Sequence, residues 1–159
     1  MITQDLIDSV KLGEGFSRTV YTDSLGHLTV GYGKLVDPNV AGAGLTEEQA
    51  EQLLRSDLEV FEEAAERVVG DEVWSWLSQR RRDVLTEMAF NMGPGNLAKF
   101  QNMIAALEEQ DYDLAAAEAL DSRWAKQVGQ RAERLAQRLR GCTQIYRRAL
   151  RAAPRPVVT

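Results

Sequence analysis

Two carboxyl side chains and one hydroxyl follow one another closely near the beginning of the sequence. Glu14 stands between two glycines, Asp23 lies nine residues later, and Thr29 lies six residues after Asp23. Glycoside hydrolysis uses such groups, because one carboxyl gives its proton to the leaving oxygen while the second stays ionised beside the developing oxocarbenium ion. A hydroxyl close to them can orient an attacking water. The three residues are therefore candidates for the catalytic groups of a glycosidase.

Each of the three residues also fits an ordinary structural role. A Glu before a Gly is frequent at a helix end, the Asp-Ser-x-Gly sequence at 23–26 is typical of a turn, and a Thr is common in a strand. Their spacing is by itself a weak signal. The secondary structure that would bring the three side chains together therefore has to be considered next.

The segments on either side of Glu14 have different patterns. Residues 3–12 place their apolar side chains on one face, which predicts a short amphipathic helix with Thr3 as its N-cap. Residues 16–35 are rich in Thr, Val and Tyr and are interrupted by glycines, which predicts two or three short antiparallel strands. A sheet this small needs a helix to pack on. Glu14 is thus expected where helix meets sheet, and Asp23 in a turn between strands.

A long helix is predicted over residues 46–69. Thr46 and Gln49 form a capping box at its start. An apolar stripe then recurs at steps of four and three residues, made of Leu54, Leu58, Phe61, Ala65 and Val68. A helix this long could join two lobes. Further helices are predicted at about 71–92, 96–108, 111–119, 122–126 and 129–151, which indicates a compact helical lobe.

The composition excludes several classes of protein. The 159 residues are 44% apolar and 27% charged, which is typical of a soluble globular chain and not of a disordered one. No apolar stretch reaches the roughly 18 residues of a membrane span, and no secretory signal is visible. One cysteine, Cys142, and one histidine, His27, exclude disulfide frameworks and metal sites built from several such residues. The sequence implies no metal and no organic cofactor.

The charge is unevenly distributed along the chain. The net charge is −5, yet residues 121–159 hold 10 basic and 2 acidic side chains. Solvated helix faces are the simpler explanation, and a basic surface that meets a polyanion is the alternative. No DNA- or RNA-binding motif accompanies these arginines, so no binding of nucleic acid is expected.

The sequence around the three candidates resembles that of a known enzyme family. The pattern Glu14-x8-Asp23-x5-Thr29, within the strings EGF and VYTDSLGHLTVGYG, is similar to the catalytic signature of the phage-type lysozymes (endolysins) of glycoside hydrolase family 24. The segments AFNMG at 89–93 and DSRW…QRAERL at 121–135 resemble C-terminal segments of that family. The resemblance thus covers most of the chain.

This resemblance implies an α+β fold that is mainly α and lysozyme-like. A small N-terminal β-sheet lobe, about 13–60, would be joined by the long helix to a larger helical C-terminal lobe. That second lobe would comprise about 61–152 together with residues 1–12. The whole chain, 1–159, would form a single lysozyme-like domain whose two lobes flank a peptidoglycan cleft.

The resemblance also assigns roles to individual residues. Glu14 would be the general acid, Asp23 the second carboxylate, and Thr29 the residue that holds the attacking water, which favours inversion. Leu35 and Phe90 match positions that line the substrate groove. The implied enzyme is a lysozyme, or N-acetylmuramidase, that hydrolyses the β-1,4 bond between N-acetylmuramic acid and N-acetylglucosamine in bacterial peptidoglycan.

A few positions depart from the family's pattern. Lys34 stands where the best-known members carry a His, and Asp57 falls where that His finds its acidic partner. We therefore expect a Lys34–Asp57 ion pair between sheet and helix. If this pair is exposed, it should contribute little to the stability of the fold. Met103 and Glu118 occupy two other groove positions where the family's pattern leads us to expect polar residues, which bears on side-chain specificity.

Alternative functions stay open beside hydrolysis. The chain could have the lysozyme fold and bind peptidoglycan with little catalysis. It could also be a lytic transglycosylase, which leaves an anhydro-sugar in place of a reducing end. A third hypothesis is an arginine-rich helical module, at about 123–155, that binds a partner protein or nucleic acid.

The setting implied by the resemblance is lysis of a bacterial host by a phage. A lysozyme without a signal peptide would accumulate, as a monomer, in the host cytoplasm until it is released to the cell wall or periplasm. Because the chain has no membrane segment, a separate holin-like pore or delivery by the virion is expected. Bacterial peptidoglycan is the expected partner.

Overall fold

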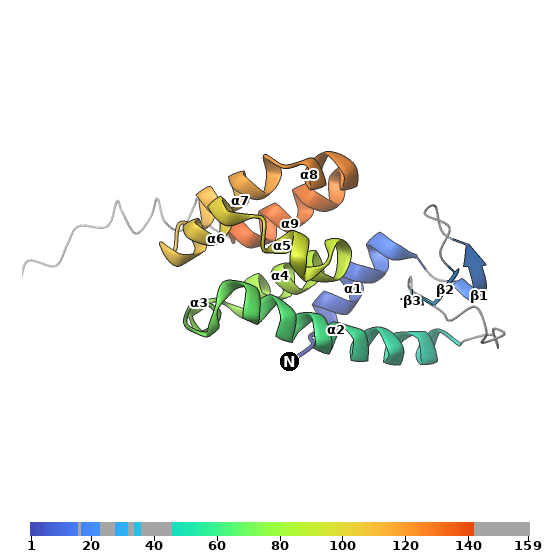
Figure 1. Cartoon of the computed structure of the whole chain (residues 1–159). Coiled ribbons are helices and arrows are strands. Elements are labelled where there is room, and N and C mark those ends of the chain that lie inside the picture. The colour runs from blue at the N-terminus through green and yellow to red at the C-terminus, as the bar shows by residue number, and fades with distance from the viewer. Residues whose placement is uncertain (16, 23–27, 32–33, 36–45, 142–159) are drawn as a thin grey trace, which may run out of the picture. The chain divides into compact units, whose positions relative to one another are not determined.

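The computed structural model describes residues 1–15, 17–22, 28–31, 34–35 and 46–141 (Figure 1). Over these ranges the elements in chain order are α1 (Gln4–Glu14), β1 (Ser17–Thr22), β2 (Leu28–Gly31), β3 (Lys34–Leu35), α2 (Glu47–Val69), α3 (Asp71–Trp76), α4 (Gln79–Met92), α5 (Pro94–Leu97), α6 (Gln101–Glu108), α7 (Tyr112–Leu120), α8 (Arg123–Val128) and α9 (Gln130–Arg140). The chain divides into two compact units, unit 1 at Met1–Lys99 and unit 2 at Phe100–Thr159.

The expected α+β fold with a separate N-terminal sheet lobe is wrong. Helices make up most of the described chain, and the three strands are only 6, 4 and 2 residues long. The strands group with α1–α5 in unit 1, and the apolar side chains described as buried lie in helices or directly beside them. Strands this short cannot bury a core of their own, so the packing of helices holds the fold together.

The strands in unit 1 pair in the order β1-β2-β3, antiparallel throughout. Thr29 on the central strand β2 pairs with Tyr21 on β1 and with Leu35 on β3. The β1–β2 register shifts between Ser17 and Tyr21. Strand β2 also contacts α2, so the strands reach the helical part of unit 1 through their central member.

Helix α1 confirms the predicted amphipathic helix and its cap. The Thr3 side chain accepts a hydrogen bond from the backbone N–H of Leu6, and the apolar face of the helix is buried. The helix continues two residues beyond the predicted end at residue 12. It stops at Gly15, whose φ of 69° turns the backbone out of the helix. Glu14 is therefore the last helical residue and is not part of a loop.

Helix α2, the longest of the described helices, begins with the predicted capping box. The Thr46 hydroxyl accepts from the Gln49 N–H at 3.1 Å, and the Gln49 side chain accepts from the Thr46 N–H at 3.0 Å. Leu54 and Leu58 from the predicted stripe are buried, whereas Phe61 is half-buried. The helix packs on α1, α3, α4 and α5, all of which belong to unit 1. Helix α2 is therefore the helix on which the other helices of unit 1 pack, and it does not join a sheet lobe to a helical lobe.

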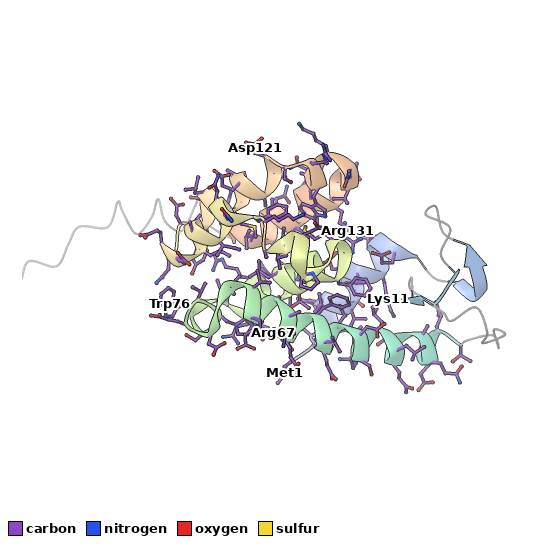
Figure 2. All side chains as sticks on the ribbon, viewed as in Figure 1. Met1, Lys11, Arg67, Trp76, Asp121 and Arg131 are labelled. Atoms are coloured by element: carbon purple, nitrogen blue, oxygen red, sulfur yellow. The ribbon has the colours of Figure 1, made fainter. Side chains whose placement is uncertain are left out.

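The two tryptophans of α3 diverge, as the i, i+2 spacing predicts. Trp74 is buried and carries the Arg82 guanidinium over its ring at 5.6 Å, while Trp76 lies at the surface (Figure 2). Arg82 Nε also donates to the Trp74 carbonyl at 2.9 Å. None of the helices within the described ranges is long and apolar enough to cross a membrane.

Unit 2 is built by α6 to α9, with α7 packed mainly against α6 and α9. Its core contains fully buried side chains such as Met103, Leu107 and Leu139. Phe100 meets Trp124 edge to face, with ring centroids 6.2 Å apart and planes at 82°. The predicted last helix, 129–151, is described only as far as Arg140; residues 142–159, including Cys142, lie outside the described ranges.

Candidate active site

Glu14 ends α1 and stands directly before the segment that leads into β1. Its side chain is half-buried. The N–H of Gly15 closes the helix by donating to the Lys11 carbonyl at 3.1 Å. Because Glu14 is the last residue of α1, its position depends on how that helix is held.

Thr29 and Leu35 are neighbours on adjacent strands. Their Cα atoms are paired across β2 and β3, and antiparallel Cα partners lie about 4.5–5.5 Å apart. Tyr21 faces Thr29 from β1, and Asp23 follows Tyr21 by two residues. Asp23 itself lies outside the described residues, so its role in the site stays a prediction.

Phe90 lies on α4 and is half-buried. Its ring meets Phe61 of α2 with centroids 5.4 Å apart and planes at 83°. It also packs against the apolar cluster formed by Ile2, Leu6, Ile7, Val10, Ala50, Leu54 and Leu58. The structure therefore places Phe90 at the contact of three helices, and its predicted contact with substrate stays a prediction.

Two hydrogen bonds from hydroxyls to buried carboxylates tie α1 to α4. Thr3 Oγ1 donates to Asp83 Oδ2 at 2.6 Å, and Ser9 Oγ donates to Glu87 Oε2 at 2.5 Å. Asp83 also accepts from Gln79 Nε2 at 2.9 Å. The helix that carries Glu14 is thus fixed to α4 near its start and again at its middle.

An ion pair ties the last turn of α1 to α2. Lys11 Nζ bonds Glu51 Oε2, and Arg55 approaches the other oxygen of Glu51 at 3.8 Å (Lys11 is labelled in Figure 2). Arg55 also donates to the Ile2 carbonyl at 3.1 Å. Lys11 lies one turn before Glu14, so α1 is held to α2 close to the candidate acid.

Sequence patterns missed the buried acids on α4. Glu87 is 0% exposed and Asp83 is 3% exposed. The available signal in the sequence was their place in the run DVLTEMA at 83–89, which is otherwise mostly apolar. The structure buries all the residues of this run. An acid inside a buried run needs a polar partner. The hydroxyl of Thr3, the N-cap of α1, is the partner of Asp83, and the hydroxyl of Ser9 within α1 is the partner of Glu87. Over the described ranges, no three His, Cys, Asp or Glu side chains gather as they would around a metal ion.

Comparison with known proteins decides the family. The sequence model for phage lysozymes matches residues 11–141, a range that contains all five predicted site residues. The chain belongs to the phage lysozyme family. It is accordingly a glycoside hydrolase of the lysozyme type.

Curated relatives agree with this membership of the phage lysozyme family. The endolysin of Salmonella phage P22 is 31% identical over 119 residues, which cover 72% of this chain and 78% of the endolysin. The probable T4-type lysozyme 2 of Dictyostelium discoideum is 26% identical over 157 residues, 84% of this chain and 92% of that protein. The pre-baseplate central spike protein Gp5 of Enterobacteria phage T4 is 29% identical over 82% of this chain. The match spans only 26% of the spike protein's length.

The positions that depart from the family's pattern lie in both units. Lys34 is on β3, paired through its Cα with Val30, and its side chain lies outside the described side chains. The Lys34–Asp57 ion pair therefore stays a prediction. Met103 is 0% exposed and belongs to the core of unit 2, whereas Glu118 is half-buried on α7. A fully buried Met103 cannot offer its thioether to a sugar without a change in the packing of α6.

Proposed function

We propose that this phage lysozyme family member hydrolyses the β-1,4 bond between N-acetylmuramic acid and N-acetylglucosamine in bacterial peptidoglycan. Glu14 serves as general acid, Asp23 as the second carboxylate, and Thr29 as the residue that positions water. The observation that supports this most is the placement of Glu14. It is the last residue of a helix that is anchored to both α2 and α4, and it lies inside the range matched by the family.

The proposed step moves one proton and exchanges one carbon–oxygen bond. Glu14 gives its proton to the glycosidic oxygen as that bond breaks, and Asp23 stays ionised near the oxocarbenium-like centre. A water held by Thr29 attacks the opposite face of the sugar and loses its proton to the Asp23 carboxylate, which acts as the general base. Attack from that face inverts the anomeric centre, and no glycosyl-enzyme forms.

Leu35 and Phe90 complete the proposal as substrate-binding residues. The pairing of Leu35 with Thr29 in the sheet supports a place for Leu35 beside the water-positioning group. Phe90 offers a half-buried ring on α4. Both would contact the apolar faces of the sugar rings and orient the linkage.

Host-wall lysis by a phage is the proposed setting. In this proposal a monomeric enzyme stays in the host cytoplasm and reaches the wall late in infection through a separate holin-like pore. The relative from phage P22 is named an endolysin, which supports a role in host lysis. The relative from phage T4 is named a central spike protein, and a wall-degrading role carried by the virion is the corresponding alternative.

Digestion of purified peptidoglycan tests the proposed reaction. Wild type, Glu14→Gln and Asp23→Asn would be compared by reducing-end release and mass spectrometry, with Glu109→Gln as the matched control because Glu109 is exposed at the end of α6. We expect new N-acetylmuramic acid reducing ends from wild type and the control. Loss of proton donation should lower the rate of Glu14→Gln by about 10²-fold or more.

Each alternative gives a different result in the same assay. Products that end in an anhydro-sugar would identify a lytic transglycosylase. Sedimentation of the wild-type chain with the wall, without new ends of either kind, would identify a binding protein. Undiminished hydrolysis by Glu14→Gln would reject Glu14 as the acid.

A further inference from the structure

Two similar hydrogen bonds join α1 to α4 at different distances from Glu14. The Thr3–Asp83 bond is 2.6 Å long and the Ser9–Glu87 bond is 2.5 Å long. The two carboxylates lie one turn apart on α4, and both are buried. The same pair of helices therefore carries a remote bond, eleven residues before Glu14, and a near bond, five residues before it.

Stability alone does not account for two buried carboxylates at this contact. Removing a carboxylate from water is costly, and packed apolar side chains of similar volume usually serve stability as well or better. A hydrogen bond differs from an apolar contact because it is directional. The bond from Ser9 to Glu87 consequently fixes how far α1 slides along α4 and how it rotates about its own axis.

The near bond is linked to Glu14 by unbroken helix. Five residues of α-helix span about 7.5 Å along the axis, and no irregularity lies between Ser9 and Glu14. A shift of α1 at Ser9 is therefore passed to Glu14 almost undiminished. General-acid catalysis is sensitive to such shifts, because a misplacement of about 1 Å can cost about 10²-fold in rate.

We propose that Ser9 and Glu87 form a positioning pair that sets where Glu14 meets the glycosidic oxygen. This inference rests on the proposed function, since it assigns the pair a role in placing the general acid. Neither residue touches the substrate in this account. Ser9 and Glu87 act through the position of α1, and the Lys11–Glu51 ion pair assists at the last turn.

Steady-state kinetics of Ser9→Ala on soluble peptidoglycan fragments tests the inference. We expect kcat to fall about tenfold with KM unchanged within about twofold, because the acid is displaced while the sugar sites are intact. Ser9→Thr and Ser9→Val add a second comparison, since the two side chains have the same shape and differ in the hydroxyl. Ser9→Thr should keep several-fold more kcat than Ser9→Val.

Thr3→Ala is the matched control for a purely structural effect. It breaks the remote bond to Asp83 and the N-cap together, so its Tm should fall at least as far as that of Ser9→Ala. Its kcat should nevertheless stay within about twofold of wild type when both are assayed well below their Tm. Equal losses of kcat in Thr3→Ala and Ser9→Ala would overturn the inference, because the loss would then follow stability and not distance from Glu14.

Glu14→Gln in the same assay distinguishes a failure of the positioning pair from a failure of the proposed function. Full kcat in Ser9→Ala beside an inactive Glu14→Gln overturns the positioning pair and leaves the proposed function standing. An active Glu14→Gln overturns the assignment of the acid, and the inference falls with it. A selective loss in Ser9→Ala and Ser9→Val, with Glu14→Gln inactive, supports both.

Discussion

Phe61 and Phe90 meet edge to face across the contact between α2 and α4, with ring centroids 5.4 Å apart. This is the most extensive contact between helices in unit 1. The family resemblance implies that Phe90 lines the substrate groove, and the structure adds that its ring takes part in joining these helices. Edge-to-face pairs stabilise by about 0.5–1.5 kcal/mol beyond the apolar area that they bury.

A double-mutant cycle of Phe61→Leu and Phe90→Leu should reveal this coupling. Urea unfolding of the four proteins should give an interaction energy of about 0.5–1.5 kcal/mol. Val60→Ala is the control, because Val60 neighbours Phe61 in the chain but is 62% exposed. The changes in the free energy of unfolding caused by Val60→Ala and Phe90→Leu should be additive within about 0.5 kcal/mol. Strict additivity of the two Phe variants would show that the ring contact contributes nothing specific.

Replacing Thr29 should separate its hydroxyl from its shape. Thr29→Val keeps the branched side chain that suits a central strand but removes the proposed water ligand. We expect a fall in kcat of about 10²-fold for Thr29→Val, and a much smaller fall for Thr29→Ser. Far-ultraviolet circular dichroism and Tm would verify folding. Equal rates for Thr29→Val and wild type would remove Thr29 from the proposed mechanism.

Leu58→Ala should be among the most destabilising substitutions in α2. Leu58 is 0% exposed and belongs to the cluster that packs α1 against α2. The lost contacts and the cavity together should lower the free energy of unfolding by about 3–5 kcal/mol. Leu53→Ala makes the same chemical change on the same helix at a position that is 39% exposed. It should cost less than half as much in urea unfolding, and similar costs at both sites would contradict the described packing.

The glycines around α5 should respond in opposite ways to alanine. Gly93 has φ 86° and ψ 149°, a conformation that residues with a Cβ rarely adopt, so Gly93→Ala should cost about 1–3 kcal/mol. Gly95 lies inside α5, and an added Cβ there meets nothing within 4 Å. Gly95→Ala should be neutral or stabilise by up to about 1 kcal/mol. Thermal unfolding of both variants would check the contrast.

Local signals in the sequence were sufficient for several elements. The Thr46–Gln49 capping box and the Thr3 cap were predicted, because a cap depends on residues within one turn of each other. The end of α1 was placed two residues too early. Gly13 lies inside the helix, because a single glycine is tolerated there, and the positive φ that ends the helix occurs at Gly15.

Contacts between residues far apart in the sequence could not be predicted from local patterns. The density of β-forming residues in 16–35 predicted short strands, and the resemblance implied a sheet lobe. Whether short strands form a lobe depends on what they pack against. The pairing of Ser9 with Glu87 joins residues 78 positions apart, and no local pattern encodes it. For the candidate site, the sequence supplied the residue types and the resemblance supplied the roles. The anchoring of Glu14 through α1 became visible only with the structure.

The capping box of α2 has a practical consequence for engineering. The side chains of Thr46 and Gln49 satisfy two backbone N–H groups at the first turn of α2, and both bonds are made between residues of this turn. A reporter peptide inserted immediately ahead of Thr46 should accordingly leave the helix register intact. That position is a suitable point for attaching an affinity tag or a fluorescent probe to the enzyme.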